Sequence, residues 1–557
     1  MQLTNEQLME IIRYAYVEKM SSRKIQAVTG ISKSAVNRFL SRKTYKEFWE
    51  TYDEKPHAGV NIDPPEQRRS TLPKGRYVFT SAQNNSYVHL GFLNSLKHFL
   101  KQKDAELIVG TNLYNKNGYQ NLGKDPSIQE DERVWFDPHI KDYIKDEQSQ
   151  VADNLLWLGE LNMSPTKVNP FSGFYNYTKL ESGIIPHNKV NLESLPVHKK
   201  DPAKFLYTTG SITRPNFIQK IAGQKAEWHH IIGALYVEVD EDGDWFARQL
   251  QAESSTGNFY DLEYYYTPNG IENHIGKSVE AINWGDLHFE KIDKQVAENA
   301  FGVKVHNNPM MTTFSKIENN GNMLDTLRPR YQFCHDTADF TTRNHHNIKD
   351  PHFRFEMFAK NYDSVRNSLT ECSNGLNAMC RDFSETVVVQ SNHDVALERW
   401  LKSADYRLDP PNAVFFLERQ LAAYKAIESG DTDYNIFGDT MTTLTPQLKD
   451  QKITFLGTDE SFRLFDEHTG IECGYHGDLG INGSRGTANA YTKIGIRVNI
   501  GHSHSAKIKD GVYQAGVSGL LDMGYNKGAS SWSHSHIITY RNGKRCIVTM
   551  KNGKWRA

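Results

Sequence analysis

The chain has 557 residues, more than one hydrophobic core accommodates, and this length predicts about two to four domains. With 24% charged and 38% hydrophobic residues, and no apolar run near the roughly 20 residues that span a bilayer, the composition excludes disordered and membrane-embedded proteins. A net charge of −2 excludes a globally basic nucleic-acid-binding protein, so any such binding depends on local patches.

Residues 1–52 are predicted to form a helix-turn-helix domain. Apolar residues recur at helical spacing at the start, and serines can cap two further helices on either side of a turn at Gly30. The segment resembles resolvase-like and transposase-like DNA-binding domains, and its first 50 residues carry nine Lys and Arg against five Glu. The predicted DNA contacts on the last helix are Lys33, Ser34, Asn37, Arg38, Arg42 and Lys43. The alternative is a small helical bundle that makes oligomer contacts.

The N-terminal sequence lacks the charged start, apolar middle and cleavage site of a signal peptide, so we expect a cytoplasmic protein. Residues 53–75 are polar and contain prolines, as in a linker. Residues 76–275 begin with a strand, a helix and a strand, which predicts an α/β domain. The loop with Gln83, Asn84 and Asn85 lies where such a domain binds ligands, or is a plain polar loop. No internal repeat is apparent in the sequence.

Chemistry-bearing residues concentrate in residues 276–557. Five short segments carry Asp, Asn or His, and four of them follow a strand-like run directly. The ends of such strands converge on one edge of a sheet. Carboxylates together with neutral imidazoles suit Mn²⁺, Fe²⁺ or Zn²⁺, and the five cysteines form no CxxC pair that would indicate a zinc-thiolate site. The residues of these segments are Asp286, His288, Asp336, Asp339, Asn392, His393, Asp394, His476, His502 and His504.

In their order, spacing and strand context, the segments GDLH, HDTAD, SNHD, YHGD and GHSH resemble the five motifs of calcineurin-like metallophosphoesterases. The resemblance implies a four-layer β-sandwich flanked by helices over residues 276–557. It implies that Asp286, His288 and His504 hold one metal, that Asn392, His476 and His502 hold a second, and that Asp336 bridges both. By the same resemblance His393 is the catalytic acid, and Asp339 orients it. Mn²⁺ is the metal the family favours, with Fe²⁺, Zn²⁺ and Mg²⁺ as alternatives.

The sequence departs from the family at two positions. His335 and Ser391 stand where glycines usually precede the bridging Asp and the metal-binding Asn, so we expect differently shaped loops. Arg343 is a tentative phosphate-binding residue or else a surface arginine. The pair His345 and His346, the pair His534 and His536, and the loop around Arg485 are left open in the same way.

Together with the N-terminal segment, the motifs resemble phage-encoded SbcD-type DNA nucleases, which implies a pre-early enzyme that degrades host DNA. Such nucleases dimerise and work with an ATPase, so we expect a homo-oligomer and a separate partner protein, because the chain has no P-loop motif. The alternatives are a phosphatase or small-molecule phosphodiesterase of the same superfamily, and a non-catalytic DNA-binding regulator with a structural metal site.

Overall fold

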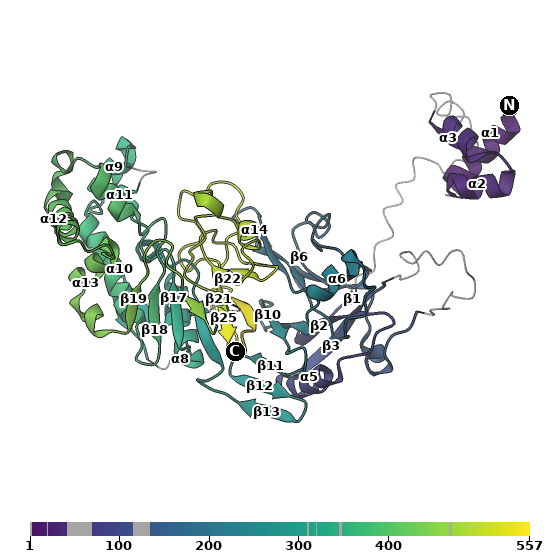
Figure 1. Ribbon diagram of the computed structural model, residues 1–557, viewed down its shortest axis with the longest axis horizontal. Helices are drawn as coiled ribbons and strands as arrows, with labels where there is room; N and C mark the ends of the chain where they lie inside the picture. Colours follow the sequence, from purple (N-terminus) through teal and green to yellow (C-terminus); the bar gives the residue numbers. More distant parts are fainter. Residues whose placement is uncertain are drawn as a thin grey trace. The chain divides into compact units, whose positions relative to one another are not determined.

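The computed structural model describes residues 3–41 except 19, residues 70–114, and residues 134–557 except 309, 310, 319, 345–347, 467 and 469. The chain divides into two compact units, Met1–Arg68 and Arg69–Ala557 (Figure 1). Both contain helices, and the second is a mixed α/β structure with several sheets. Within the described ranges, no helix has the length and apolar character needed to cross a membrane.

The first unit is a small helical domain. Its helices are α1 (Asn5–Ile12), which continues into a π-helical turn (Arg13–Val17), α2 (Ser22–Thr29) and α3 (Lys33–Leu40). Gly30 ends α2 with a φ of 71°, a conformation that glycine adopts without strain. The buried core consists of Ile11, Ile12, Ile25, Ile31, Val36 and Phe39.

Two helices therefore lie on either side of a glycine turn, where the sequence predicts them. Lys33, Ser34, Asn37 and Arg38 are all exposed on α3. The other two predicted DNA contacts, Arg42 and Lys43, lie outside the described residues. DNA binding by this unit stays a prediction.

In the second unit, a six-stranded sheet carries most of the predicted motifs. In spatial order its strands are β19 (Ile453–Phe455), β18 (Glu385–Val388), β17 (Tyr331–Cys334), β14 (Val279–Asn283), β25 (Ser535–Tyr540) and β26 (Arg545–Thr549). Strands β14, β17, β18 and β19 are parallel, whereas β25 and β26 form an antiparallel hairpin against β14. The carboxyl ends of the four parallel strands consequently meet at one edge.

An eleven-stranded sheet runs through the middle of the unit. Its order is β1 (Ser70–Thr71), β4 (Gln148–Ala152), β5 (Leu155–Leu158), β6 (Ser182–Ile185), β8 (Lys204–Thr208), β7 (Leu192–Leu195), β23 (Lys507–Lys509), β24 (Val512–Gln514), β22 (Arg497–Ile500), β21 (Ile471–Glu472) and β20 (Arg463–Leu464). Strands on both sides of the predicted boundary at 275/276 belong to this sheet, joined where β7 pairs with β23. The two predicted domains therefore share a sheet.

The remaining strands form smaller sheets. A four-stranded sheet has the order β10 (Trp245–Gln251), β9 (Gly233–Val239), β2 (Arg76–Gln83) and β3 (Ala105–Asn112). A three-stranded sheet contains β11 (Phe259–Asp261), β12 (Tyr264–Thr267) and β13 (Gly270–Asn273), and a hairpin contains β15 (Val303–His306) and β16 (Thr313–Lys316). The strand, helix and strand predicted at the start of residues 76–275 are present as β2, α5 (Leu90–Lys103) and β3.

Helices cover one face of the six-stranded sheet, in the green part of Figure 1. They are α7 (Lys294–Phe301), α8 (Met323–Leu327), α10 (Val365–Met379), α11 (Ala396–Ser403), α12 (Ala413–Ser429) and α13 (Ile436–Leu444). A further helix, α9 (Pro351–Ala359), has no buried residue. Two short helices lie elsewhere, α6 (Ile221–Trp228) and α14 (Ala488–Tyr491). Phe333 and Val387 on the other face pack against Ile471 of β21, so the six-stranded and eleven-stranded sheets lie face to face.

Candidate metal centre

The predicted metal ligands converge at one place in the second unit. Each ligand segment follows a strand: β14 precedes Asp286 and His288, β17 precedes Asp336, and β18 precedes Asn392. In the eleven-stranded sheet, β21 precedes His476, and β22 precedes His502 and His504. Because the two sheets pack face to face, their strand ends bring all seven side chains together.

Four of these residues form a buried group in which one ligand atom from each lies within 4.8 Å of the others: Asp286, His288, Asp336 and His504. His504 Nε2 lies 3.1 Å from an Asp286 carboxylate oxygen and 3.1 Å from His288 Nε2. His288 Nε2 lies 3.6 Å from Asp336 Oδ2. This group coincides with the set expected for one metal and its bridging carboxylate.

The remaining three ligands form a second group that adjoins Asp336 through His476. His476 Nε2 is 3.3 Å from Asp336 Oδ2, and His502 Nδ1 is 3.1 Å from Asn392 Oδ1. The rings of His476 and His502 are in edge contact, with centroids 5.1 Å apart. Asp336 therefore lies between two groups of potential ligands, which is the position that the sequence assigns to it.

The polar atoms of this cluster are suited to a cation. Both carboxylate oxygens of Asp286, Oδ1 of Asp336 and both ring nitrogens of His476 are buried without a hydrogen-bond partner among the described residues. Burial lowers the pKa of His476, but the Asp336 and Asp286 carboxylates raise it to about 10, so the pocket favours positive charge. Hard carboxylate oxygens and imidazole nitrogens fit a divalent transition-metal ion, although its identity and number are not shown.

Several ligands have backbone conformations that non-glycine residues rarely adopt. His288, Asp336, His502 and His504 have φ angles of 46°, 43°, 72° and 58°. Each such residue costs about 1–3 kcal/mol unless the surrounding structure compensates for it, and such residues cluster at functional sites. The loops are therefore held in place by the packed sheets beneath them.

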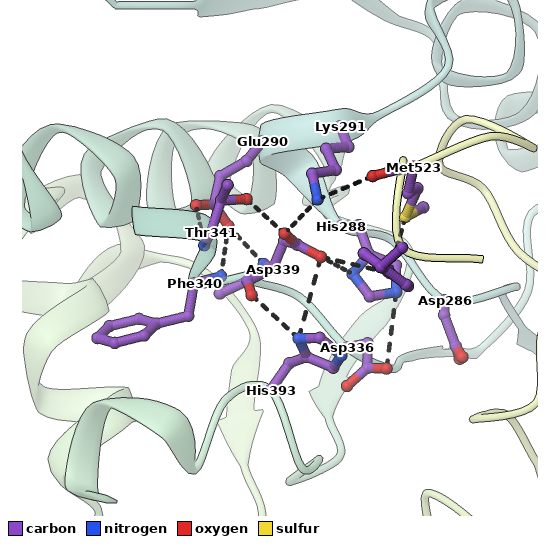
Figure 2. Close-up of polar contacts among 12 residues, drawn as sticks. Asp286, His288, Glu290, Lys291, Asp336, Asp339, Phe340, Thr341, His393 and Met523 are labelled. Atoms are coloured by element: carbon purple, nitrogen blue, oxygen red, sulfur yellow. Dashed lines mark hydrogen bonds and ion pairs between the residues drawn. The ribbon is translucent and has the colours of Figure 1, made fainter. Parts of the chain in front are cut away.

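A second layer of polar residues surrounds His288 and His393 (Figure 2). The Asp339 carboxylate lies 3.3 Å from His288 Nδ1 and 2.8 Å from Lys291 Nζ. His393 Nδ1 contacts the backbone oxygen of Asp339 at 3.0 Å, whereas the nearest Asp339 carboxylate oxygen is 4.0 Å away. The carboxylate of Asp339 thus orients His288, and its carbonyl oxygen orients His393, which refines the predicted pairing.

Glu290 holds the loop that contains Asp339. Its buried carboxylate accepts hydrogen bonds from the backbone N–H groups of Asp339, Phe340 and Thr341 (Figure 2). Ser368 on α10 donates to the same carboxylate. The loop is consequently fixed by a side chain that follows the first motif by two residues.

The cluster opens into a cavity of about 750 Å³. Its walls include Asn392, His393 and His502 from the cluster, and the cationic side chains of Arg485 and Lys507. Trp532 lies against His504, with ring centroids 4.2 Å apart, and Tyr525 is the next aromatic ring along the wall. The cavity therefore combines potential metal ligands, positive charge and aromatic surface.

Arg343 requires a correction, because the structure places it outside this cavity. Its side chain is buried, with Nε and Nη2 2.7 Å from the two carboxylate oxygens of Asp409 and Nη1 2.6 Å from Asp363. These carboxylates raise the pKa of Arg343 despite its burial. Arg343 therefore holds buried segments of the chain together. The arginine that lines the cavity is Arg485.

The other five histidines that the sequence analysis named fall into three groups. His534 and His536 are internal: His534 Nε2 lies 3.0 Å from the Gly519 carbonyl, and Gly285 N donates to His536 Nδ1. His335, at a position where calcineurin-like metallophosphoesterases have glycine, is fully buried beside His476, and burial lowers its pKa to about 4. The pair at 345 and 346 lies outside the described residues.

Sequence reasoning missed four residues of the site: Glu290, Lys291, Tyr525 and Trp532. Glu290 and Lys291 could have been found from their position directly after the first motif. Tyr525 and Trp532 come from loops with no motif, and only the folded chain brings them to the cluster.

Comparison with known proteins gives one informative match. The chain is 39% identical over 509 residues to "Protein A1" of Escherichia phage T5, and the match covers 90% of this chain and 86% of that protein. No protein-family profile matches the chain. No solved structure matches it either.

Proposed function

Because the chain belongs to the family of phage T5 Protein A1, we propose that it is a phage-encoded, metal-dependent DNA nuclease that hydrolyses phosphodiester bonds with two metal ions. The observation that carries the proposal is the gathering of six potential ligands around a seventh, Asp336. We further propose that residues 276–557 have the metallophosphoesterase sandwich, with Mn²⁺ as the metal. Its place of action would be the cytoplasm of the infected host.

The residues have distinct tasks in this proposal. Asp286, His288 and His504 would hold one metal, Asn392, His476 and His502 the other, and Asp336 both. When bound, the metals would bind the phosphate and lower the pKa of the attacking water. His393, whose Nδ1 is held by the Asp339 carbonyl, presents Nε2 as a hydrogen donor to the leaving oxygen. Burial lowers the pKa of His393, but the Asp336 and Asp339 carboxylates more than offset this and raise it.

DNA as the substrate rests on two features. The cavity places Arg485 beside the cluster, where it can bind a backbone phosphate, whereas Lys507 in the same wall is paired with Glu193. The first unit exposes Lys33, Asn37 and Arg38 on one helix, which are residue types that contact phosphates and base edges. A homo-oligomer and a separate partner protein remain part of the proposal.

The test is a cleavage assay with linear and circular duplex DNA, in Mn²⁺ or with EDTA. We expect wild type to cleave DNA only with metal, and His393→Ala to lose at least about 100-fold, the range of general acid catalysis. His198→Ala, which alters an exposed histidine, is the matched control and keeps full activity. If DNA stays intact while a chromogenic phosphodiester is hydrolysed, the enzyme is instead a phosphodiesterase of the same superfamily.

Removal of residues 1–68 separates the two contributions to DNA recognition, because these residues form a compact unit of their own. We expect the truncated protein to hydrolyse a small phosphodiester as wild type does, but to bind duplex DNA more weakly and with a smaller dependence on salt. Unchanged affinity for DNA would assign the first unit to protein contacts.

A further inference from the structure

The two halves of the second unit have the same strand topology. The sheet order β10-β9-β2-β3 has the same directions as β26-β25-β14-β17: an antiparallel hairpin, then an antiparallel pair, then a parallel pair. The order β4-β5-β6-β8-β7 likewise matches β20-β21-β22-β24-β23 in every strand direction. The matching strands also follow one another along the chain in the same order. The strands without a counterpart are β1, β11, β12 and β13 in the first half and β15, β16, β18 and β19 in the second.

Single hydrogen bonds show the same correspondence. Ser81 N donates to the Gly210 oxygen at 3.1 Å, and Asp286 N donates to the Gly516 oxygen at 3.1 Å. Each of the two acceptors precedes a residue that forms a parallel bridge with Ser81 or Asp286, respectively. Ser81 therefore occupies in the first half the position of Asp286 in the second, and Gly210 the position of Gly516.

We propose that residues 70–275 and 276–557 are two copies of one fold, and that the first copy has lost its metal centre and now positions the metal-binding loops of the second. This inference rests on the metal centre proposed above. It gives a role to residues 70–275, in which the sequence shows no recognisable motif.

The equivalent positions show which of the predicted metal ligands the first copy lacks. Thr208 and Gln514 lie two residues before Gly210 and Gly516, so they are equivalent too. Thr208 pairs with Ile185 of β6, and Gln514 pairs with Ile500 of β22, which makes Ile185 and Ile500 equivalent. Gly110 of β3 pairs with Ser81, and the register of β14 on β17, extended past the strand ends, places Asp336 opposite Asp286. Gly110 is therefore the counterpart of Asp336. The replacements are Ser81 for Asp286, Gln83 for His288, Gly110 for Asp336, His187 for His502 and Lys189 for His504. At these five positions both carboxylates and two of the three imidazoles are gone. The registers of β5 on β6 and of β21 on β22 place Glu160 at the position of the fourth histidine, His476.

The space for a metal is closed as well. Gly501 in the second copy leaves room for the Asp286 carboxylate, because a side chain there would collide with it. Its counterpart is Pro186, whose ring would lie 2.6 Å from a side chain placed at Gly110. Lys189 directs its ammonium group to the Val168 carbonyl, 2.9 Å away, and to Asp510. Among the described residues, the first copy consequently does not retain the ligand set of the second.

The copies are joined as a symmetric dimer would be. Leu192 of β7 pairs with Tyr207, and Ile508 of β23 pairs with Tyr513, so Leu192 and Ile508 are equivalent. Where β7 pairs with β23, Leu192 and Ile508 lie directly opposite each other. Equivalent residues that face each other in antiparallel strands define an internal two-fold relation, as in an isologous interface.

This junction borders the metal-binding loops. Strand β23 begins three residues after His504, and Ser194 N donates to the Ala506 oxygen at 3.1 Å. The Ser194 hydroxyl donates to the Ser531 oxygen at 2.7 Å, next to Trp532. Lys507 Nζ forms an ion pair with Glu193 at 2.8 Å. The first copy thus holds the loop of His502 and His504 as well as the aromatic wall against His504.

The first experiment measures metal bound per chain by elemental analysis after equilibration with Mn²⁺. We expect Gln83→Ala/His187→Ala to bind as much Mn²⁺ as wild type, and His288→Ala/His502→Ala to lose it, with thermal unfolding confirming that both fold. Loss of metal from the first pair overturns the inference. Retention by the second pair overturns the metal centre on which the inference rests.

The second experiment tests positioning with Ser194→Ala, which removes one hydrogen bond between the copies. We expect the Mn²⁺ concentration for half-maximal binding to rise by about fivefold, the worth of one hydrogen bond. Ser164→Ala is the control, because that exposed hydroxyl contacts only Thr166 nearby. Equal Mn²⁺ binding by both variants would overturn the positioning role, since a structural role elsewhere would change only the melting temperature.

Discussion

His288 Nδ1 lies 3.3 Å from the carboxylate of Asp339, in a site where both side chains are fully buried. A carboxylate that accepts a hydrogen bond from Nδ1 fixes the tautomer of a metal-binding histidine. Nε2 is then free to bind the metal. Lys291 Nζ, 2.8 Å from the same carboxylate, compensates its charge. The three residues form a chain from the partly exposed Lys291 to the predicted ligand.

Asp339→Asn should weaken metal binding by about 10–100-fold, the usual effect of losing the carboxylate behind a ligating histidine. The amide can present its N–H to His288 Nδ1 and so favour the wrong tautomer. The Mn²⁺ dependence of activity and isothermal titration with Mn²⁺ would measure the change. Lys294→Met, at an exposed lysine nearby in sequence, serves as the control, and equal affinities would contradict the assigned role.

Gly501→Ala should abolish metal binding while leaving the fold intact. The new methyl group would collide with the Asp286 carboxylate oxygen, so that carboxylate must move out of the cluster. Gly457→Ala is the matched control, because the nearest atom to its methyl group would be Glu460 Oε2 at 3.6 Å. Metal content and circular dichroism distinguish the two, and normal metal content in Gly501→Ala would contradict the packing.

Arg343→Met should destabilise the protein without changing substrate affinity. Removing one partner of a buried ion pair costs about 3–5 kcal/mol, since Asp409 and Asp363 would be left uncompensated. Urea unfolding measures the loss. A higher KM with normal stability would instead restore the phosphate contact predicted from the sequence.

Glu371→Gln should remove a pH dependence of stability. Burial raises the pKa of Glu371 to about 7, although the hydrogen bond from Thr312 N lowers it. Between its usual pKa of about 4.3 and 7, the folded protein holds a proton that the unfolded chain has released. The free energy of unfolding therefore falls as the pH rises through this window, by about 3–4 kcal/mol for this group. Urea unfolding from pH 4.5 to 8 in EDTA would show this slope in wild type only, and parallel curves would contradict it.

The convergence of the predicted ligands follows from the sequence pattern, because four of their five segments come directly after a strand-like run. Strands of one sheet end at a common edge, so Asp286, Asp336 and Asn392 had to lie near one another once β14, β17 and β18 were recognised. Arg343 could not be judged in this way, because its partners Asp363 and Asp409 are brought to it by helices whose packing the sequence pattern does not specify.

The repeated fold was invisible in the sequence for a related reason. Strand pairing depends on apolar residues that many sequences supply, whereas the residues that would reveal the repeat are those that changed, such as Ser81 for Asp286 and Gly110 for Asp336. The retained pair His187 and His502 is too little to detect without the register of β6 and β22.

The pairing of β7 with β23 also limits how the chain can be divided. A fragment starting at residue 276 would keep every predicted metal ligand, yet it would expose the backbone N–H and C=O groups of β23 along a free sheet edge. Ile508, now packed in the core with Leu192, would become exposed. We expect such a fragment to associate with other chains through that edge, so a fragment that keeps the predicted ligands in place should start at β1, the first strand of the first copy.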